Sequence, residues 1–404
     1  MSDAKFETLK SLDWDLKDAE TDKFAATIHP YHARFIPQIP ERLIDTYTEP
    51  GDFVLDPFNG SGTTTMVAGT MQRHSIGVDL NPLACLIARV KCMQYDIPQL
   101  EDHIDEFLQK AKQNIRTIDS QQRLDDFTAT TNTQDIPKTI PEFPDKKRWY
   151  TEDVLDQLGA LFYLVNNIDN SQFRDFYRVC FSAITKKVCR SDEDWTYIGD
   201  NMYPDKDTNK LTPIDKNYDV YSHFKNRVER ALGGVKDFAS ENPIDAEIYQ
   251  TDARDLAFIQ QELDFDSIDF AITSPPYPNA VDYARYHRLS FYWFGWEVTD
   301  TKEEEIGARS KRGRKNAIED YYRESRAVYE EVYRLLRPGS HFCIVVGNTQ
   351  HRNERVQAVE TITEMCRDIG FTYKGELERE LSRQSMSQKE INQESIIIVS
   401  KTAE

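Results

Sequence analysis

The 404-residue sequence has no long hydrophobic run, few cysteines and a deficit of positive charge. No apolar stretch approaches the roughly 20 residues that a membrane-spanning helix needs, and the charged N-terminal segment lacks the apolar core of a signal peptide. The six cysteines form no CxxC pair and no Cys/His set with zinc spacing, which predicts reduced, buried thiols and no metal site. These absences predict a soluble, cytoplasmic protein with no membrane partner.

Positive charge is scarce but unevenly distributed. The net charge of −19 excludes a uniformly basic surface of the kind that binds nucleic acid through its phosphates. Lysine and arginine are nevertheless concentrated at residues 186–190 and 311–315. The first cluster closes a helical pattern, where cations suit the helix dipole, so it is not assigned to a site. The second is broken by Gly313 and preceded by Gly307, which predicts a mobile basic loop that follows phosphate groups.

The chain divides into three stretches. Residues 1–96 and 245–404 alternate buried-strand and helix patterns, as α/β proteins do, whereas residues 97–244 are polar and mostly helical in pattern. That middle stretch far exceeds the roughly dozen residues of a simple crossover between parallel strands, so it predicts an insertion that carries binding function. Two final strands, at 371–378 and 394–400, follow each other without a helix and predict an antiparallel pair appended to a parallel sheet.

A glycine-rich turn follows the first predicted strand, in the sequence DPFNGSGTT at residues 56–64. Gly60 and Gly62 allow the backbone to pass close to a ligand, and the helix that follows presents free N–H groups to an anion. A dinucleotide site would have the longer GxGxxG pattern, and a P-loop would have a lysine after the second glycine. Neither is present, and the spacing fits a ligand with a carboxylate.

Three predicted strands end in an acidic residue: Asp56, Asp79 and Asp252. The carboxyl ends of parallel strands meet at one edge of a sheet, where ligands bind in such folds. Asp79 suits a pair of ribose hydroxyls, and Asp252 suits an adenine amino group. Turn formation and capping explain any one of these residues equally well, but not easily all three in order.

The fourth predicted strand runs into Thr273-Ser274-Pro275-Pro276-Tyr277. Two prolines hold the chain extended and leave nearby carbonyl groups free. The exocyclic amine of a base is a poor nucleophile, because its lone pair is conjugated into the ring. Hydrogen bonds from the amine to Ser274 and to the Pro275 carbonyl favour a tetrahedral nitrogen, and Tyr277 is suited to stack on a flipped base. A tight turn with a buried tyrosine is the alternative.

The motifs DPFNGSGTT, GVDLNP and TSPPY resemble those of the DNA amino-methyltransferases, which form N4-methylcytosine and N6-methyladenine. Residues 28–37 resemble the cofactor-packing motif of this family, which implies that Phe35 packs beside the cofactor. The resemblance covers residues 25–96 and 245–400. Departures from the family pattern occur at Asn59, His32 and Arg34.

The resemblance implies S-adenosylmethionine as cofactor, double-stranded DNA as substrate, and a cognate restriction endonuclease or other defence-system subunit as a possible partner. It also implies a Rossmann-like class I methyltransferase fold, an α/β fold with a mostly parallel seven-stranded sheet, and a target-recognition role for the helical insertion at 97–244. The predicted cofactor contacts are Phe35, Asp56, Phe58, Gly60, Gly62, Thr63, Asp79 and Asp252. The predicted catalytic residues are Ser274, Pro275, Pro276 and Tyr277.

Serine at the first position of the catalytic motif is typical of the cytosine-N4 enzymes, so Ser274 favours cytosine over adenine. Adenine-N6 methylation, amino-methylation of RNA and a catalytically silent nucleic-acid-binding subunit remain alternatives. Basic residues after the catalytic motif are predicted to contact substrate. These are Arg285, Arg288, Lys311, Arg312 and Arg314. The aromatic residues interleaved with them at helical spacing are predicted to pack in the core.

Overall fold

The computed structural model describes most of the chain. The described residues are 4–17, 19, 28–31, 35–125, 136–190, 203–204, 211–212, 218–262, 268–277, 282–351, 354–380 and 393–402. His32 and Arg34, two of the departures from the family pattern, lie outside them. Among the described residues, no helix combines the length and apolar character needed to cross a bilayer.

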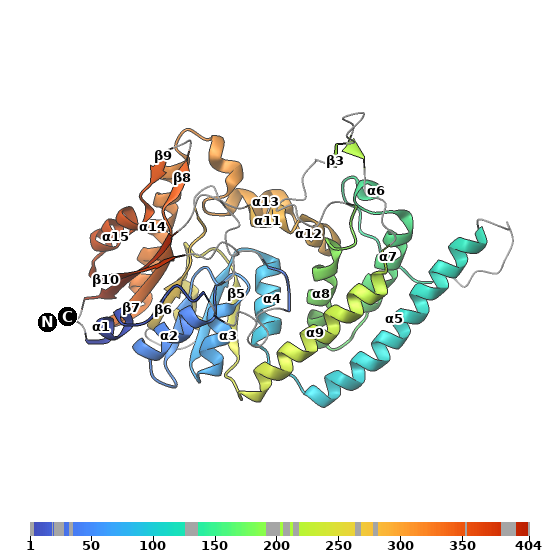
Figure 1. Cartoon of the computed structure of the whole chain (residues 1–404), viewed down its shortest axis with the longest axis horizontal. Coiled ribbons are helices and arrows are strands. Elements are labelled where there is room, and N and C mark those ends of the chain that lie inside the picture. The colour runs from blue at the N-terminus through green and yellow to red at the C-terminus, as the bar shows by residue number, and fades with distance from the viewer. Residues whose placement is uncertain are drawn as a thin grey trace.

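A seven-stranded sheet forms the centre of the molecule (Figure 1). Its strands are β1 (Phe53–Asp56), β2 (His74–Asp79), β5 (Ala246–Gln250), β6 (Ile268–Thr273), β7 (Leu336–Val346), β10 (Phe371–Glu380) and β11 (Gln393–Lys401). They lie in the order β10-β11-β7-β6-β1-β2-β5. Only β11 runs against its neighbours, because it pairs antiparallel with both β7 and β10, while the other pairs are parallel. The predicted mostly parallel sheet with an antiparallel C-terminal pair is confirmed, and the order is that of a Rossmann-like α/β fold.

Alternate residues of the central strands belong to two different hydrophobic clusters. Val54 of β1 and Phe270 of β6 join one cluster, while Leu55 and Ala271 join the other. A strand buried on both faces has this pattern, as expected where helices cover a parallel sheet on both sides. Helices α2 (Gln38–Tyr47), α3 (Thr63–Thr70) and α4 (Pro82–Cys92) cover one face, and α10 (Ala257–Glu262), α14 (Ala317–Leu335) and α15 (Ala358–Ile369) cover the other.

The middle of the chain is mainly helical, as predicted. It contains α5 (Ile97–Asp125), α6 (Lys146–Trp149), α7 (Glu152–Asn166), α8 (Ser171–Thr185), α9 (Val220–Ser240) and a short strand pair of β3 (Tyr203–Pro204) and β4 (Leu211–Thr212). Side chains cap three of these helices: Thr151 accepts from the backbone of Val154, Asn170 from that of Phe173, and Asp219 from that of Ser222. These helices extend to one side of the sheet (Figure 1), and their apolar faces continue the cluster that includes α4.

Short elements connect β6 to α14. They are α11 (Tyr283–Tyr286), α12 (Arg288–Phe294), α13 (Val298–Glu304) and the 3-10 helix η2 (Arg309–Gly313). Trp293 of α12 is fully buried and makes edge contacts with Phe162 of α7 and Phe181 of α8. The prediction that this aromatic helix packs in the core is confirmed. The remaining elements are α1 (Ala4–Lys10), β8 (Thr349–His351) and β9 (Glu354–Val356).

The dipeptide Pro338-Gly339 is typical of the end of a helix, but the structure places it inside β7. Helix α14 ends at Leu335, and Leu336 already has an extended backbone and pairs with Ile268 of β6. The register with β6 shifts after this pair, and Gly339 has a φ of +86°. The proline and glycine therefore form a bulge in the strand rather than a helix stop.

Gly62 is required by packing as well as by backbone conformation. Its φ is +79°, and an added Cβ would lie 2.7 Å from the Cβ and 2.9 Å from the Cα of Ala88. Helix α3 starts directly after Gly62, so this contact fixes how closely α3 approaches α4. Helix α3 follows β1 and helix α4 follows β2, so both begin at the edge of the sheet where the parallel strands end.

We expect Gly62→Ala to lower the free energy of unfolding by roughly 1–3 kcal/mol, because the backbone of Ala88 cannot yield. Chemical denaturation measures this change. Gly233→Ala is the matched control, because an added Cβ on this exposed position of α9 meets no atom within 4 Å. The control substitution should stabilise the protein by about 0.5–1 kcal/mol. Equal stability of Gly62→Ala and the wild type would contradict the packing role.

Candidate active site

A cavity opens at the carboxyl ends of β1, β2 and β6. Most of the predicted cofactor residues line it. These are Phe35, Asp56, Phe58, Gly60, Thr63, Asp79 and Asp252. Ser274 and Pro276 of the predicted catalytic loop line the same cavity, whereas Gly62, Pro275 and Tyr277 do not. Two sequence motifs more than 200 residues apart are therefore brought to one space.

Asp56 connects the glycine-rich turn to the catalytic strand. One carboxylate oxygen accepts from the Thr64 hydroxyl (2.6 Å), and the other accepts from the Thr273 hydroxyl (2.7 Å) and the Phe58 backbone N–H (3.1 Å). Burial raises the pKa of Asp56 to about 6, although these hydrogen bonds act to lower it. Its carboxylate is thus committed to protein donors, and it supports the cavity wall from within.

Asp79 lies at the end of β2 with its carboxylate held in place. One oxygen accepts from the Gly60 backbone N–H (2.8 Å) and the other from that of Asn81 (2.8 Å). Burial raises the pKa of Asp79 to about 6, and the backbone hydrogen bonds oppose that rise. Each oxygen has lone pairs left for a ligand, because an ionised carboxylate accepts about four hydrogen bonds.

Asp252 has a close partner that the sequence pattern did not reveal. Arg254 donates to both of its carboxylate oxygens, and its backbone N–H donates to one of them (2.9 Å). Burial alone would raise the pKa of Asp252, but the hydrogen bonds from Arg254 outweigh burial and lower it. Asp252 therefore stays ionised and shares its acceptor capacity with Arg254.

Two asparagine residues line the cavity, and their side chains are placed differently. Asn81 caps α4 by accepting from the backbone of Leu83 (2.9 Å), and its Nδ2 is buried without a partner among the described residues. The Asn59 Oδ1 accepts from Thr65 (3.2 Å), and its amide packs against Gly77 of β2, where an added Cβ would lie 2.4 Å from Nδ2. Buried donors without partners are costly, so the Asn81 amide fits a ligand with an acceptor oxygen.

Lys91 places a positive charge behind the glycine-rich turn. Its side chain is fully buried in α4, and its ammonium group donates to the hydroxyl of Ser61 (3.1 Å), which lines the cavity. The sequence pattern did not single out Lys91, since lysine is rarely buried and nothing local marks it. With the N-terminus of α3, this charge favours an anionic group at the turn.

Aromatic side chains form another part of the wall. Phe35 and Phe58 were predicted there, and the structure adds Tyr31 and Tyr283. The Tyr31 ring stacks on Tyr283 (6.0 Å between centroids) and on His287 (4.9 Å). Tyr31 lies in the same motif, residues 28–37, from which Phe35 was predicted. That motif could therefore have indicated Tyr31 as well. Flat apolar walls of this kind suit a nucleoside.

Tyr277 anchors the end of the catalytic loop. Its hydroxyl donates to Glu394 of β11 (2.7 Å), and Glu394 also accepts from the buried Arg379 of β10 (3.1 Å). Burial and the neighbouring Glu394 carboxylate raise the pKa of Tyr277 well above its usual value. The structure thus gives Tyr277 a fixed position, while the four residues that follow it lie outside the described residues.

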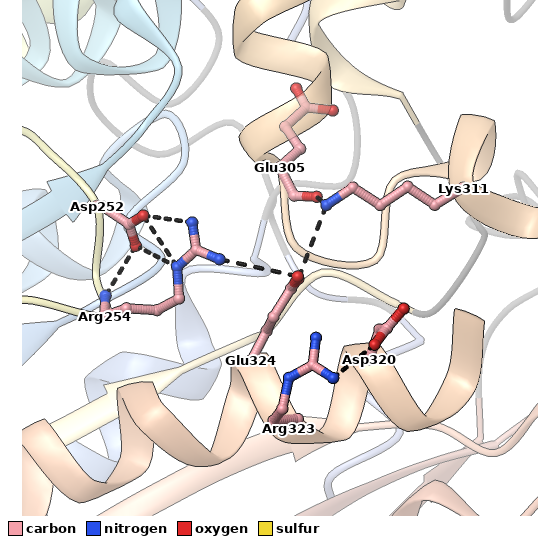
Figure 2. A network of polar contacts seen from close by, with 7 residues as sticks. All are labelled: Asp252, Arg254, Glu305, Lys311, Asp320, Arg323 and Glu324. Atoms are coloured by element: carbon pink, nitrogen blue, oxygen red, sulfur yellow. Dashed lines mark hydrogen bonds and ion pairs between the residues drawn. The ribbon is translucent and has the colours of Figure 1, made fainter. Parts of the chain in front are cut away.

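Lys311 is not a phosphate contact, contrary to the sequence-based prediction. Its side chain is buried, and its ammonium group donates to the backbone carbonyl of Glu305 (2.7 Å) and pairs with Glu324 of α14 (3.7 Å). Figure 2 shows how Glu324 also faces Arg254. A charge held by two protein partners inside the fold cannot follow a nucleic-acid backbone.

Arg285, Arg288 and Arg314 are not among the residues that line the cavity. Arg285 and Arg288 are half-buried, and Arg288 lies over the ring of Trp149 (5.9 Å). Arg314 is exposed, and the side chain of Arg312 lies outside the described ones.

A second cavity, between α8 and the segment that contains α11 and α12, is lined by Lys186 and Lys187. Lys186 lies over the ring of Tyr286 (4.5 Å). His287, which stacks on Tyr31 in the wall of the first cavity, also lines this one. The basic cluster left unassigned on the sequence therefore lies beside the predicted site.

The family model described as DNA methylase, for the N6/N4 type, matches residues 7–90 and 268–404. Those two segments include the glycine-rich turn and the catalytic loop, and the gap between them contains most of the helical region.

Several curated relatives are type II methyltransferases. M.MjaII of Methanocaldococcus jannaschii is 30% identical over 200 residues, which are 48% of this chain and 35% of the relative. M.MvaI of Kocuria varians is 23% identical over 298 residues, 70% of this chain and 60% of the relative. M.BsoBI of Geobacillus stearothermophilus is 19% identical over 413 residues, 84% of this chain and 77% of the relative. The matched part is thus only about a third of the length of M.MjaII.

Solved structures show weak overall similarity. A SAM-dependent methyltransferase from Methanosarcina mazei is 12% identical, with 90% of this chain and 98% of that chain covered and a TM-score of 0.34. The rRNA methyltransferase aviRa from Streptomyces viridochromogenes is 9% identical, with 92% and 87% covered and a TM-score of 0.35. Scores this low carry no argument, so the fold assignment rests on the strand order.

We expect Thr273→Val to lower the free energy of unfolding by about 1–3 kcal/mol, because it removes a donor from a buried carboxylate. The pKa of Asp56 is about 6 in the fold and near 4 when unfolded, so the native state binds more protons and stability falls as pH rises between these values. Loss of the donor raises the folded pKa further, and urea denaturation should show a larger difference from wild type at pH 7.5 than at pH 4.5.

Thr117→Val serves as the control, because the Thr117 hydroxyl donates only to the Gln113 carbonyl on an exposed helix surface. It should change stability by no more than about 0.5 kcal/mol at either pH. A pH-independent effect of Thr273→Val equal to that of the control would refute the role of Asp56 as a connector.

Proposed function

Because the chain belongs to the DNA methylase family, whose model matches it on both sides of the helical region, we propose that it methylates an exocyclic amino group of a DNA base. S-adenosylmethionine is the methyl donor in this proposal, and cytosine N4 is the target. The observation that carries it is the shared cavity: the predicted cofactor residues and Ser274 line one space.

The cavity has the groups that such a cofactor requires. The N-terminus of α3 and the buried Lys91 favour its carboxylate, and the unused amide donor of Asn81 offers a further hydrogen bond. Asp79 would accept from the ribose hydroxyls, and Phe35 would pack beside the cofactor. When bound, the cofactor supplies an electrophilic methyl group on a positively charged sulfur.

The chain's own part in the reaction is to orient the amine. The Ser274 hydroxyl and the Pro275 carbonyl accept from its two N–H groups, which draws the nitrogen toward tetrahedral geometry. Thr273 and Tyr277, bound to Asp56 and Glu394, fix the two ends of this short loop. A loop fixed at both ends positions its acceptors without further ordering in the transition state.

The parts of the chain around this cavity are proposed to recognise DNA. We propose that residues 97–244 form a target-recognition region inserted into a methyltransferase domain made of residues 1–96 and 245–404. Arg285, Arg288 and Arg314 are proposed to contact the nucleic-acid backbone, and Tyr277 to stack on the flipped base. A cognate endonuclease is a further proposal, supported by the type II methyltransferases among the relatives.

Cytosine rather than adenine is proposed because of Ser274, whose hydroxyl is a weaker acceptor than the carboxylate or amide common at this position in adenine enzymes. The test is to incubate the full chain with mixed-sequence DNA and labelled S-adenosylmethionine, and then to identify the labelled nucleosides. We expect label in N4-methylcytosine.

Other outcomes of this experiment have distinct meanings. Label in N6-methyladenine moves the target to adenine and leaves the reaction class intact. Label in RNA alone overturns DNA as substrate. Cofactor binding without transfer to either nucleic acid overturns the enzymatic proposal in favour of a silent subunit.

Two variants test the division of roles. Ser274→Ala should bind the cofactor as the wild type does and transfer methyl groups roughly 10²-fold more slowly, whereas Asp79→Ala should lose cofactor binding. Calorimetric titration and a single-turnover assay separate the two effects. Asp320→Ala, which breaks only an ion pair with Arg323 on α14, should keep both properties (Figure 2). If Ser274→Ala and Asp79→Ala both retained full activity, the assignment of the site would fail.

A further inference from the structure

Glu305 is a cavity residue for which no role has been assigned. It follows α13 directly and lines the cavity together with its neighbours Glu304 and Ile306. Its Oε1 accepts from the backbone N–H of Ala284 (2.9 Å). Its Oε2 is buried and has no hydrogen-bond partner among the described residues. A buried oxygen without a hydrogen-bond partner lowers the stability of the fold, unless a bound ligand interacts with it.

A network of charged groups holds Glu305 in this place. Lys311 donates to its backbone carbonyl, so the main chain of this wall segment is tied to η2. Lys311 also pairs with Glu324, which in turn faces Arg254 (3.8 Å), the partner of Asp252 (Figure 2). In this view the Glu305 side chain points away from Lys311, so the lysine fixes its backbone and leaves its carboxyl group uncompensated.

The lining of the cavity is mostly acidic, and the positive charges closest to it lie behind the lining, Lys91 on Ser61 and Arg254 on Asp252. Five acidic residues line it, and the described lining residues include no lysine or arginine. The five are Asp56, Asp79, Asp252, Glu304 and Glu305. Burial, together with the nearby carboxylates of Asp282 and Asp79, raises the pKa of Glu305 to about 8, although the backbone hydrogen bond from Ala284 acts to lower it. In the empty cavity at neutral pH, this carboxyl group is therefore mostly protonated.

We infer that Glu305 contacts a positively charged group of the bound cofactor through its carboxylate. The inference rests on the proposed function and adds a residue to its cofactor site. S-adenosylmethionine carries two positive groups, the methylsulfonium and the amino group of its methionine part. Either one would compensate the charge of an ionised Glu305, and the amino group would also donate a hydrogen bond to the buried oxygen. A neutral donor would satisfy the oxygen but leave the charge uncompensated.

A coupling between binding and protonation follows. A cation that enters the cavity favours the ionised form of Glu305, so binding releases a proton when the pH is below the pKa of the free site. Affinity should then rise with pH, by up to tenfold per unit below about pH 8. The other titratable or charged groups near Glu305 are Asp79, Asp282, Tyr31, Tyr283 and Lys311. They remain in place in a Glu305 variant.

Calorimetric titration of the purified full chain with S-adenosylmethionine tests the inference. Glu305→Gln should weaken binding by about 10- to 100-fold, the effect of losing a hydrogen bond to a charged group, and should remove most of the rise in affinity between pH 6 and pH 8. Glu303→Gln is the matched control, because Glu303 is exposed on α13, which ends directly before Glu305, and does not line the cavity. The control should bind as the wild type does at each pH.

Two analogues identify which positive group is contacted. S-adenosylhomocysteine lacks the sulfonium charge, and sinefungin has an amine in place of the methylsulfonium. If Glu305 faces the sulfonium, Glu305→Gln should lose affinity for S-adenosylmethionine and sinefungin but not for S-adenosylhomocysteine. If it faces the amino group, the loss should extend to all three ligands.

The wild-type protein alone provides a second readout, in case Glu305→Gln does not fold. Titrations at pH 7 in buffers of different ionisation enthalpy count the protons released, and close to one is expected. Unchanged affinity of a folded Glu305→Gln variant, or binding without proton release, would overturn the inference while leaving the proposed function intact. Failure of the wild type to bind S-adenosylmethionine at any pH would instead overturn the proposed function itself.

Discussion

The buried carboxylate of Asp56 is the interaction on which the site depends. Its three donors come from the turn after β1, from α3 and from the last residue of β6, so one carboxylate joins the cofactor side of the cavity to the catalytic side. Its pKa of about 6 expresses the balance: burial penalises the charge, and the donors offset only part of that penalty. Loss of any of these hydrogen bonds should destabilise the fold, because the cost of burying the Asp56 carboxylate is then less well compensated. The geometry of the site is thus coupled to the stability of the sheet.

A second constraint acts at the far end of the catalytic loop. Tyr277 is bound to Glu394 on the single reversed strand, and Arg379 neutralises that glutamate from the next strand. The loop from Thr273 to Tyr277 therefore spans from the centre of the parallel sheet to its antiparallel edge. The direction of β11 makes this contact feasible. Because β11 runs opposite to its neighbours, its N-terminal end, with Glu394, lies at the edge of the sheet where the parallel strands end. A strand in the parallel direction would present its C-terminal end there instead, and Glu394 would lie at the opposite edge.

Local signals predicted most of this site, and long-range pairing explains what they missed. The strand ends, the glycine-rich turn and Ser274 follow from patterns a few residues long, and the structure brings them to one cavity. Gly62 was expected beside a ligand, but its contact with Ala88 depends on where α4 packs. Lys311 was interpreted as a surface charge, because neither Glu324 nor the carbonyl of Glu305 can be paired with it from the sequence. Glu305 itself lies in the acidic run TKEEE, where composition alone favours exposure.

The arrangement of charge resolves an apparent conflict in the composition. A net charge of −19 opposes binding to DNA, yet part of the acidity is concentrated inside a cavity whose proposed ligand is cationic. Basic side chains lie elsewhere: Lys186 and Lys187 line the second cavity, separated from the first by the stacked rings of Tyr31 and His287. Buried acidic groups next to a bound cation are neutralised locally and project little field to the surface. The net charge of the chain is therefore a poor measure of the charge that its surface presents to a ligand outside the cavity.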